Sequence, residues 1–427
     1  MLRHLLILTF ITYGIQLLGQ TTYLHCGQLI DMRSDNVQSE ITIVVVDDRI
    51  TKVEQGYKTS DSDTIQIIDL KNKTVCPGFM DMHIHIEHQS GKNRYLEKFS
   101  QNKSDIALGA VKYCERTLMA GFTSVRDLGG TGVNVSIRNA INKGDIIGPR
   151  IYTAEKSIAT TGGHADPSNG VKDELKGDPG PKDGVINSPE DAYKAVRQRY
   201  KNGADCIKIT ATGGVLSVAK DGQGPQFTVE EVEAIVKASN DYGYVTAAHA
   251  HGAEGMKRAV MGGIHSVEHG TKMTEEIMDL MIAKGTYYVP TISAGKFVAA
   301  KAKVPGFYPS IIVPKALEIG PMIQETFRKA HKRGVKIAFG TDAGVSYHGD
   351  NAAEFMFMTE VGMSNYDALK TATVNAADLM NITEDYGTIS IGKKADIIAM
   401  DGNPLDDIRS TLKIQFVMKD GIVYKHR

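Results

Sequence analysis

The sequence predicts an α/β fold, a (β/α)8 TIM barrel that carries a small β-sandwich domain built from both ends of the chain. Three observations predict it. The middle of the chain alternates apolar strands with amphipathic helices, both ends consist of short alternating strands, and polar residues directly follow several strands. With 427 residues, of which 42% are hydrophobic, the chain is long enough to fill a barrel and an accessory domain.

The first 20 residues do not resemble part of a fold. Arg3 and His4 precede an apolar run over residues 5–18, which is the order of a signal peptide. A membrane anchor and a buried N-terminal element are the alternatives, but the run is shorter than the roughly 20 apolar residues that a span needs. We expect residues 1–20 to be a signal peptide, and the mature protein to be periplasmic or secreted and free of the membrane.

Short alternating segments follow the leader and return at the far end of the chain. Asp-Asp and Asp-Ser clusters separate the first of them, and none shows helical periodicity, which is the pattern of strands and turns. We therefore predict one β-sandwich domain from residues 21–75 plus 385–427. The predicted strands are 22–26, 41–46, 65–68, 395–400 and 414–418.

The middle of the chain, residues 76–384, repeats a strand followed by a helix. Repeated units of this kind form a parallel sheet with right-handed crossovers, and a count of about eight favours a closed barrel over an open sheet. In such barrels the chemistry collects at the C-terminal ends of the strands. Candidate strands are 121–127, 206–209, 245–249, 266–269 and 336–340, and candidate helices include 229–240 and 253–261.

Five polar residues lie at the ends of predicted barrel strands. His83 and His85 follow the apolar run 78–82, and because residues i and i+2 of a strand share a face, both imidazoles would converge as half of a zinc site. This spacing is a weak signal when it occurs alone, and a single polar residue at a strand end is more often a cap or a core histidine. The other strand ends carry His249, His269 and Asp342, so that the five together predict one metal site.

Lys208 lies inside the otherwise apolar strand 206–209. A buried ammonium is costly, so a paired cation or a solvent-facing strand position is the plain interpretation. The functional alternative is an amine that has reacted with carbon dioxide. A carbamate is anionic and offers two oxygens, so it can bridge two metal ions, whereas an ammonium cannot bind a metal.

In order and spacing, these motifs resemble the amidohydrolase superfamily, in particular its imidazolonepropionase-like and Xaa-Pro dipeptidase-like branch. The resemblance covers nearly everything after the leader, and residues 387–396 resemble the family's return to its β-sandwich. The motifs that carry it are Cys-Pro-Gly-Phe-Met-Asp-Met-His-Ile-His at 76–85, Thr-Gly-Gly-His at 161–164, Lys-Ile-Thr-Ala-Thr-Gly-Gly at 208–214, His-Ala-His-Gly at 249–252, Glu-His-Gly at 268–270 and Gly-Thr-Asp-Ala-Gly at 340–344.

The resemblance implies two divalent metal ions, with zinc as the expected metal, that share a bridging hydroxide. Asp342 would take the proton of this nucleophile and pass it to the leaving nitrogen. Lys208 would be carboxylated, as N6-carboxylysine, and would bridge the ions. The ligands of the more buried ion would be His83, His85, Lys208 and Asp342, and those of the second ion Lys208, His249 and His269.

Two further histidines are expected to contact the substrate. His251 stands where some dipeptidase relatives carry a tyrosine that polarises the scissile carbonyl, so this departure leaves its role open. His164 resembles a residue that contacts the terminal carboxylate of the substrate. Either could instead be a hydrogen-bond partner behind the ligands. The remaining candidates are expected to be structural or on the surface: His88, His265, His331 and His348.

The resemblance favours an exported, dipeptidase-like or carboxypeptidase-like enzyme that cleaves a small molecule or short peptide with a free C-terminal carboxylate. Alternatives are a cyclic amidase, an amidase for N-acyl or aryl-acyl amino acids and, more distantly, a non-catalytic metal-binding protein. Lysine plus arginine number 49 against 50 acidic residues, and this balance gives no reason to expect nucleic acid. The four cysteines show no CxxC spacing and are expected to be free and buried. The oligomeric state stays open, with a homo-oligomer among the possibilities.

Overall fold

The structure is a computed structural model that describes residues 20–217 and 222–427. Apart from Gln20, the predicted signal peptide lies outside these residues. In the described part of the chain, no helix has the length and apolar character needed to cross a membrane. The four cysteines are free and buried, as expected.

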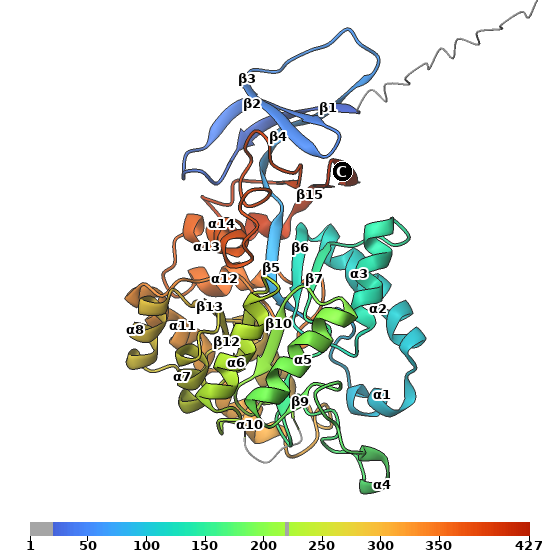
Figure 1. The fold of residues 1–427 in the computed structure, drawn as a ribbon. Coiled ribbons are helices and arrows are strands. Elements are labelled where there is room, and N and C mark those ends of the chain that lie inside the picture. Colours follow the sequence, from blue (N-terminus) through green and yellow to red (C-terminus); the bar gives the residue numbers. More distant parts are fainter. Residues whose placement is uncertain (1–19, 218–221) are drawn as a thin grey trace, which may run out of the picture.

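The barrel consists of two groups of parallel strands (Figure 1). Its strands are β5 (Phe79–Ile84), β6 (Phe122–Asp127), β7 (Arg150–Thr153), β10 (Ile207–Thr210), β11 (Thr246–Ala250), β12 (Ser266–His269) and β13 (Tyr287–Val289). The first three strands pair in the order β5-β6-β7, and the last four in the order β10-β11-β12-β13. The groups meet where the Asp205 N–H donates to the Thr153 carbonyl over 2.7 Å and Ile158 pairs with Ile209.

Residues 336–343, which we call the closing segment, complete the ring between β13 and β5. Ile337 pairs with Tyr288 of β13, and the Asp342 N–H donates to the His83 carbonyl of β5 over 2.7 Å. A regular strand was expected at 336–340, but only the bridge at Ile337 forms there. The reason is that this segment divides its hydrogen bonds between both neighbours and then turns at Asp342, whose φ is +55°.

Helices surround the barrel, and their ends follow local capping rules. In α6 (Val229–Asn240), the Thr228 hydroxyl accepts from the Glu231 N–H while the Glu231 carboxylate accepts from the Thr228 N–H. The helices expected at 229–240 and 253–261 form with these bounds. The other helices are α1 (Arg94–Ser100), α2 (Lys103–Met119), α3 (Val133–Lys143), α4 (Asp173–Lys176), α5 (Pro189–Asn202), α7 (Ala253–Met261), α8 (Glu275–Lys284), α9 (Ile292–Ala302), α10 (Val313–Ile319), α11 (Met322–Arg333), α12 (Ala353–Thr359), α13 (Asn365–Thr371), α14 (Val374–Leu379) and the 3-10 helix η1 (Ile408–Leu412).

Strands from both ends of the chain form one seven-stranded sheet in the order β16-β15-β14-β4-β1-β2-β3. It encloses a core of its own, to which Leu24, Ile43 and Phe416 contribute. Its strands are β1 (Thr21–Leu29), β2 (Gln38–Val46), β3 (Arg49–Gln55), β4 (Ile65–Pro77), β14 (Ile397–Met400), β15 (Ile414–Lys419) and β16 (Ile422–His426), and a short pair, β8 (Ala159–Thr160) and β9 (Val185–Ile186), lies apart from it. The exact domain limits, 21–75 with 385–427 and 76–384, stay predictions.

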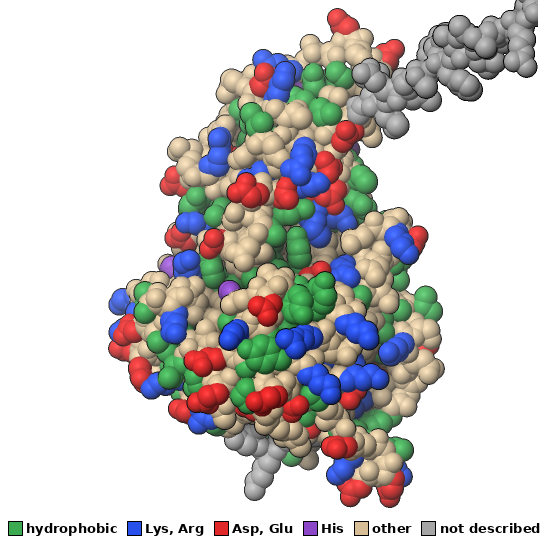
Figure 2. Space-filling model, viewed as in Figure 1, with side chains coloured by type: hydrophobic (Ala, Val, Ile, Leu, Met, Phe, Trp, Pro, Cys, Tyr) green, Lys and Arg blue, Asp and Glu red, His purple; other side chains and the backbone are tan. Residues whose placement is uncertain are grey.

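The sheet lies at one end of the barrel, and the strand connectivity places the predicted site at the other end (Figure 1). β5 follows β4 directly, so the N-terminal ends of the parallel barrel strands face the sheet and their C-terminal ends point away from it. Arg150 of β7 joins the two parts through ion pairs with Asp396 (2.8 Å) and Asp420 (2.5 Å). On the face shown in Figure 2, acidic and basic side chains are mixed over the barrel.

Candidate metal centre

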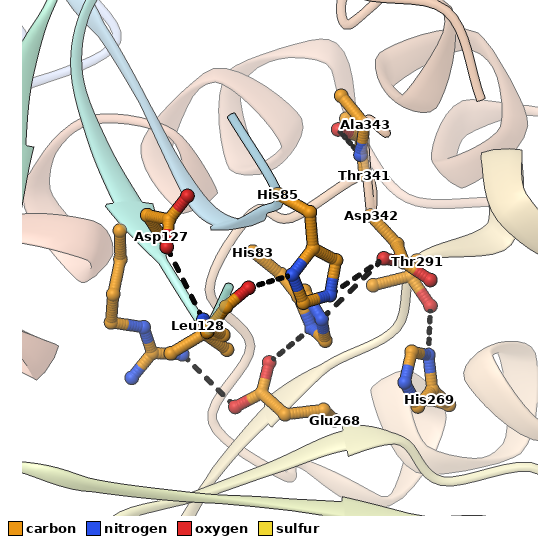
Figure 3. Close-up of polar contacts among 12 residues, drawn as sticks. His83, His85, Asp127, Leu128, Glu268, His269, Thr291, Thr341, Asp342 and Ala343 are labelled. Atoms are coloured by element: carbon orange, nitrogen blue, oxygen red, sulfur yellow. Dashed lines mark hydrogen bonds and ion pairs between the residues drawn. The ribbon is translucent and has the colours of Figure 1, made fainter. Parts of the chain in front are cut away.

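His83, His269 and Asp342 bring their donor atoms together at the C-terminal mouth of the barrel. One ligand atom from each lies within 4.8 Å of the others, and all three residues are buried. His85 reaches the same carboxylate, with Nε2 3.4 Å from Asp342 Oδ1, and His83 Nε2 lies 3.6 Å from this oxygen (Figure 3). Three imidazoles around one carboxylate form a donor set that suits zinc.

The Nδ1 atoms of these three histidines bind protein oxygens. His83 Nδ1 lies 2.8 Å from Glu268 Oε2, His85 Nδ1 lies 2.7 Å from the Gly129 carbonyl, and His269 Nδ1 lies 2.7 Å from Thr291 Oγ1. These contacts fix the rings and, for His83 and His85, turn Nε2 toward Asp342 (Figure 3). Imidazole ligands of metals typically have such an outer partner, which sets the ring orientation and the tautomer.

Glu268 and Arg126 form a buried ion pair behind His83, and the sequence analysis did not assign them a role. Arg126 Nη2 donates to Glu268 Oε1 over 2.9 Å, and its Nε donates to the Met82 carbonyl over 2.7 Å. Both side chains are fully buried. Each could have been singled out in the sequence by the criterion applied to Lys208, because each is a charged residue inside an apolar barrel strand.

The segment that carries Asp342 is held in place, while Asp342 Oδ1 accepts no hydrogen bond from the described residues. Asp81 anchors the segment before it, because its carboxylate accepts from Thr341 Oγ1 over 2.6 Å and from Asn351 Nδ2 over 2.7 Å. Asp342 Oδ1 is buried without a hydrogen-bond partner among the described residues. Burial raises the pKa of Asp342, and the charge of Lys208 opposes this rise. A buried carboxylate oxygen without a donor is costly, and a cation beside it would remove that cost.

Lys208 points its positive charge into this group from β10. Its side chain is only 3% exposed, and burial lowers the pKa of the amine while Glu268 and Asp342 oppose the shift. An ammonium at this position disfavours protonation of the surrounding imidazoles, and its positive charge would also repel a metal ion. The histidines whose pKa its charge lowers are His83, His85, His164, His249, His251 and His269.

His249 and His251 lie beside His269 on the other side of the mouth. The ring centroids of His249 and His269 are 4.7 Å apart, and those of His251 and His269 are 5.1 Å apart. His249 Nε2 lies 3.2 Å from the Gly213 carbonyl, so this ring must release that contact before Nε2 can bind a metal. His251 is oriented by a contact of 2.8 Å between Nδ1 and Thr271 Oγ1.

His164 reaches the same group from the loop after β8. Its ring stacks on His249 with centroids 4.4 Å apart, and its backbone N–H donates to Gln226 Oε1 over 2.8 Å. Its Nδ1 is buried without a hydrogen-bond partner in the described part of the chain. A Cβ at Gly214 would lie 2.1 Å from this ring, which explains the need for glycine there.

The structure therefore gathers every predicted site residue at one mouth, although only three of them form the tight donor group. Of the histidines not assigned to the site, His88 is half-buried and stacks on His85, and His348 binds the His88 carbonyl through Nε2 over 2.9 Å. His265 contacts Thr246 at the far end of β11.

The geometry of the candidate metal centre agrees with the protein family that the sequence matches. Residues 74–424 match the amidohydrolase family. The chain belongs to that family. It is therefore a hydrolytic enzyme, and amidohydrolases generally bind two metal ions at such a site.

The chain is also similar to individual proteins of this family. A solved Xaa-Pro dipeptidase with methionine bound in its active site is 51% identical, covers 95% of this chain and 100% of its own, and superposes with a TM-score of 0.92. The ochratoxinase of Aspergillus niger is 31% identical over 82% of this chain and 75% of its own length. An imidazolonepropionase from Fusobacterium nucleatum is 23% identical over 88% of this chain and 91% of its own.

Proposed function

We propose that this amidohydrolase is a binuclear metal-dependent dipeptidase or carboxypeptidase-like enzyme for short substrates with a free C-terminal carboxylate. The observation that carries this proposal is the 51% identity to a Xaa-Pro dipeptidase that holds methionine in its active site. Both products of dipeptide hydrolysis are free amino acids, so the methionine in the neighbour's site fits a dipeptide substrate.

The donor groups of this chain fit two divalent ions, and zinc is the metal that we expect. Asp342 Oδ1, which accepts no hydrogen bond from the described residues, and the neutral imidazoles around it supply the electron pairs that a cation needs. Ions bound there supply Lewis acidity, which makes water acidic enough to attack an amide at neutral pH. We assign His83, His85, Lys208 and Asp342 to one ion, and Lys208, His249 and His269 to the other.

Lys208 is proposed to be carboxylated. Burial lowers the pKa of its amine, so a larger fraction is neutral and can attack carbon dioxide. The nitrogen forms a bond to the carbon of carbon dioxide and loses one proton, which leaves a carbamate with a single negative charge. The positive ammonium among the imidazoles would thereby become an anion whose two oxygens can bind metal ions.

The remaining residues move the proton and hold the substrate. Asp342 is proposed to accept a proton from the attacking water and to deliver it to the leaving nitrogen. Burial lowers the pKa of His251 to about 3 and that of His164 to about 4, so both are neutral and each offers one N–H. We assign the His251 donor to the scissile carbonyl oxygen and the His164 donor to the terminal carboxylate.

An amidase for N-acyl or aryl-acyl amino acids is the second candidate. The match to ochratoxinase at 31% identity supports it, as do the aromatic side chains that follow β13, namely Phe297 of α9 and Phe307 and Tyr308 of the loop after it. The imidazolonepropionase relative keeps a cyclic amidase as the third candidate. All three reactions use the same ligands, so residues of the substrate pocket decide between them.

A substrate panel tests the proposal directly. The zinc-loaded protein is incubated with dipeptides ending in methionine or proline, with N-acyl methionines and with cyclic amides, and free amino acid is measured by chromatography. We expect the dipeptides to be hydrolysed fastest, no release after chelation, and strongly reduced release with the Asp342→Asn variant. A zinc-loaded protein that opens cyclic amides but leaves every dipeptide intact would contradict the proposal.

We also propose that the mature enzyme is exported, because a signal-like segment precedes the fold. The first strand, β1, begins at Thr21, directly after the proposed signal peptide of residues 1–20. Peptide scavenging outside the cytoplasm fits this location.

A further inference from the structure

A tyrosine hydroxyl lies buried over the barrel mouth without a hydrogen-bond partner among the described residues. Tyr308, in the loop between α9 and α10, is 9% exposed, and its hydroxyl makes no hydrogen bond among the described residues. Ser90 lies beside this hydroxyl, but the two do not reach hydrogen-bond geometry. Burial raises the pKa of Tyr308, so the phenol stays protonated. A buried hydroxyl without a partner is costly, which points to a ligand group that completes it.

This hydroxyl lies beside a loop that leaves the metal-site strand β5. The charge of Asp342 contributes to the raised pKa of Tyr308, after the larger effect of burial. Ser90 belongs to the loop that follows the metal-site residue His85, and its N–H donates to the Gly344 carbonyl, two residues past Asp342, over 2.7 Å. The Tyr308 hydroxyl is therefore placed among the loops that follow β13, the closing segment and β5.

The order of strands around the barrel places Tyr308 across the mouth from His164. His164 lies in the connection between β7 and β10, the third and fourth strands of the ring. Tyr308 lies between β13 and the closing segment, which are the seventh and eighth. A substrate that spans the mouth with its carboxylate at His164 directs its acyl half toward Tyr308.

An aromatic cluster holds the Tyr308 ring in place. Phe307 packs edge-on against Tyr308 with centroids 4.9 Å apart, and Phe297 packs against Tyr347 with centroids 5.1 Å apart. The Lys301 ammonium lies 5.4 Å from the Phe297 centroid, 5.4 Å from the Phe307 centroid and 5.7 Å from the Tyr347 centroid. A cation over three ring faces ties the cluster together, so the hydroxyl is oriented before the substrate binds.

We propose that Tyr308 contacts the substrate and that its hydroxyl hydrogen-bonds the polar group on the α carbon of the acyl half. In a dipeptide this group is the free α-amino group, so Tyr308 makes the site selective for a free N-terminus. The proposal rests on the proposed function, because it takes the His164 side of the mouth as the site of the carboxylate.

Three substrates that differ only at the α carbon isolate this contact: alanyl-methionine carries an α-amino group, lactoyl-methionine an α-hydroxyl, and propionyl-methionine neither. The Tyr308→Phe variant keeps the ring and removes only the hydroxyl. We expect it to lower kcat/KM about tenfold for alanyl-methionine and lactoyl-methionine, the effect of one hydrogen bond, and to leave propionyl-methionine unchanged. Binding of alanyl-methionine to the Asp342→Asn protein, measured by calorimetry, should weaken by a similar factor when Tyr308→Phe is added.

Tyr244→Phe is the matched control. Its hydroxyl donates to the Ala204 carbonyl over 2.7 Å, just before β11 begins and thus at the opposite end of the barrel. This variant should show the wild-type ratio among the three substrates, and zinc content and thermal unfolding confirm that both variants are intact.

The role of Tyr308 would be overturned by equal losses for all three substrates, or by wild-type kinetics for all three. A loss that disappears when the methionine carboxylate is converted to an amide would also overturn it, because the hydroxyl would then bind the other half. The proposed function fails separately, if the wild-type enzyme hydrolyses none of the three.

Discussion

Among the residues of the site, some orient their neighbours, and others are proposed to bind the metal ions or to transfer a proton. Asp342 combines both proposed roles, because its Oδ1 accepts no hydrogen bond from the described residues while Asp81 fixes the segment that carries it. Its φ of +55° is uncommon for a residue with a side chain, and His269 shares this feature with a φ of +69°. Such backbone strain clusters at functional sites, where the surrounding structure maintains it.

Replacing Asp342 with asparagine removes the base but keeps the shape of the side chain. We expect turnover to fall by about 10²–10⁴-fold, the usual effect of a lost general base, while the amide oxygen still allows zinc to bind. Steady-state kinetics on a dipeptide together with metal analysis checks this. Full activity in Asp342→Asn would rule out the proton transfer proposed here.

His251 and His249 lie two residues apart in the sequence and side by side in the site, so variants of the two can be compared directly. His251→Ala should leave the zinc content near that of the wild type and lower kcat/KM, since it removes only a donor to the substrate. His249→Ala should lose zinc, because that ring is assigned as a ligand. If His251→Ala loses zinc instead, the two roles have been exchanged.

The residue types of the site could be predicted because histidines, an aspartate and a lysine end or interrupt apolar strands. Their partners could not be predicted in the same way. Glu268 and Arg126 meet only after β6 and β12 are placed across the barrel, and no sequence spacing joins them. The contact between His249 and the Gly213 carbonyl likewise depends on how one loop closes.

Helices and strands with a strong local sequence pattern could be predicted, whereas segments whose structure depends on pairing with distant parts of the chain could not. The predicted strand 266–269 and helix 229–240 form with the expected bounds, because apolar periodicity and caps act locally. The closing segment did not become a regular strand, since its backbone serves two neighbours. β3 was missed because its exposed positions hide the alternation.

Strand β15 should contribute much of the stability of the seven-stranded sheet. Phe416 is fully buried in the sheet's own core, so Phe416→Ala should lower the free energy of unfolding by about 3–5 kcal/mol, as measured by denaturant titration. Ile422 of the neighbouring strand is 59% exposed, and Ile422→Ala is the control with little expected effect. Equal stability in both variants would mean that this core does not support the fold.

At the scale of the whole molecule, the sheet covers one end of the barrel and leaves the other end for chemistry. Strands from both ends of the chain enter this sheet, and its strand β1 begins at Thr21, directly after the proposed signal peptide. We predict that protein exported by its native host begins near Gln20 or Thr21, and N-terminal sequencing checks this. An intact Met1 on cytoplasmic protein would contradict export without affecting the enzyme site.

The central claim is that strand ends from all around the barrel build one centre for two metal ions. A crystal structure of the zinc-loaded enzyme, with anomalous scattering at the zinc edge, tests it most directly. The account predicts two zinc peaks at the mouth, both bound by a carboxylated Lys208, at nitrogen and oxygen distances of about 2.0–2.2 Å. His83, His85 and Asp342 should surround one peak, and His249 and His269 the other. Zinc bound elsewhere, or coordinated by His251 in place of His249, would contradict it.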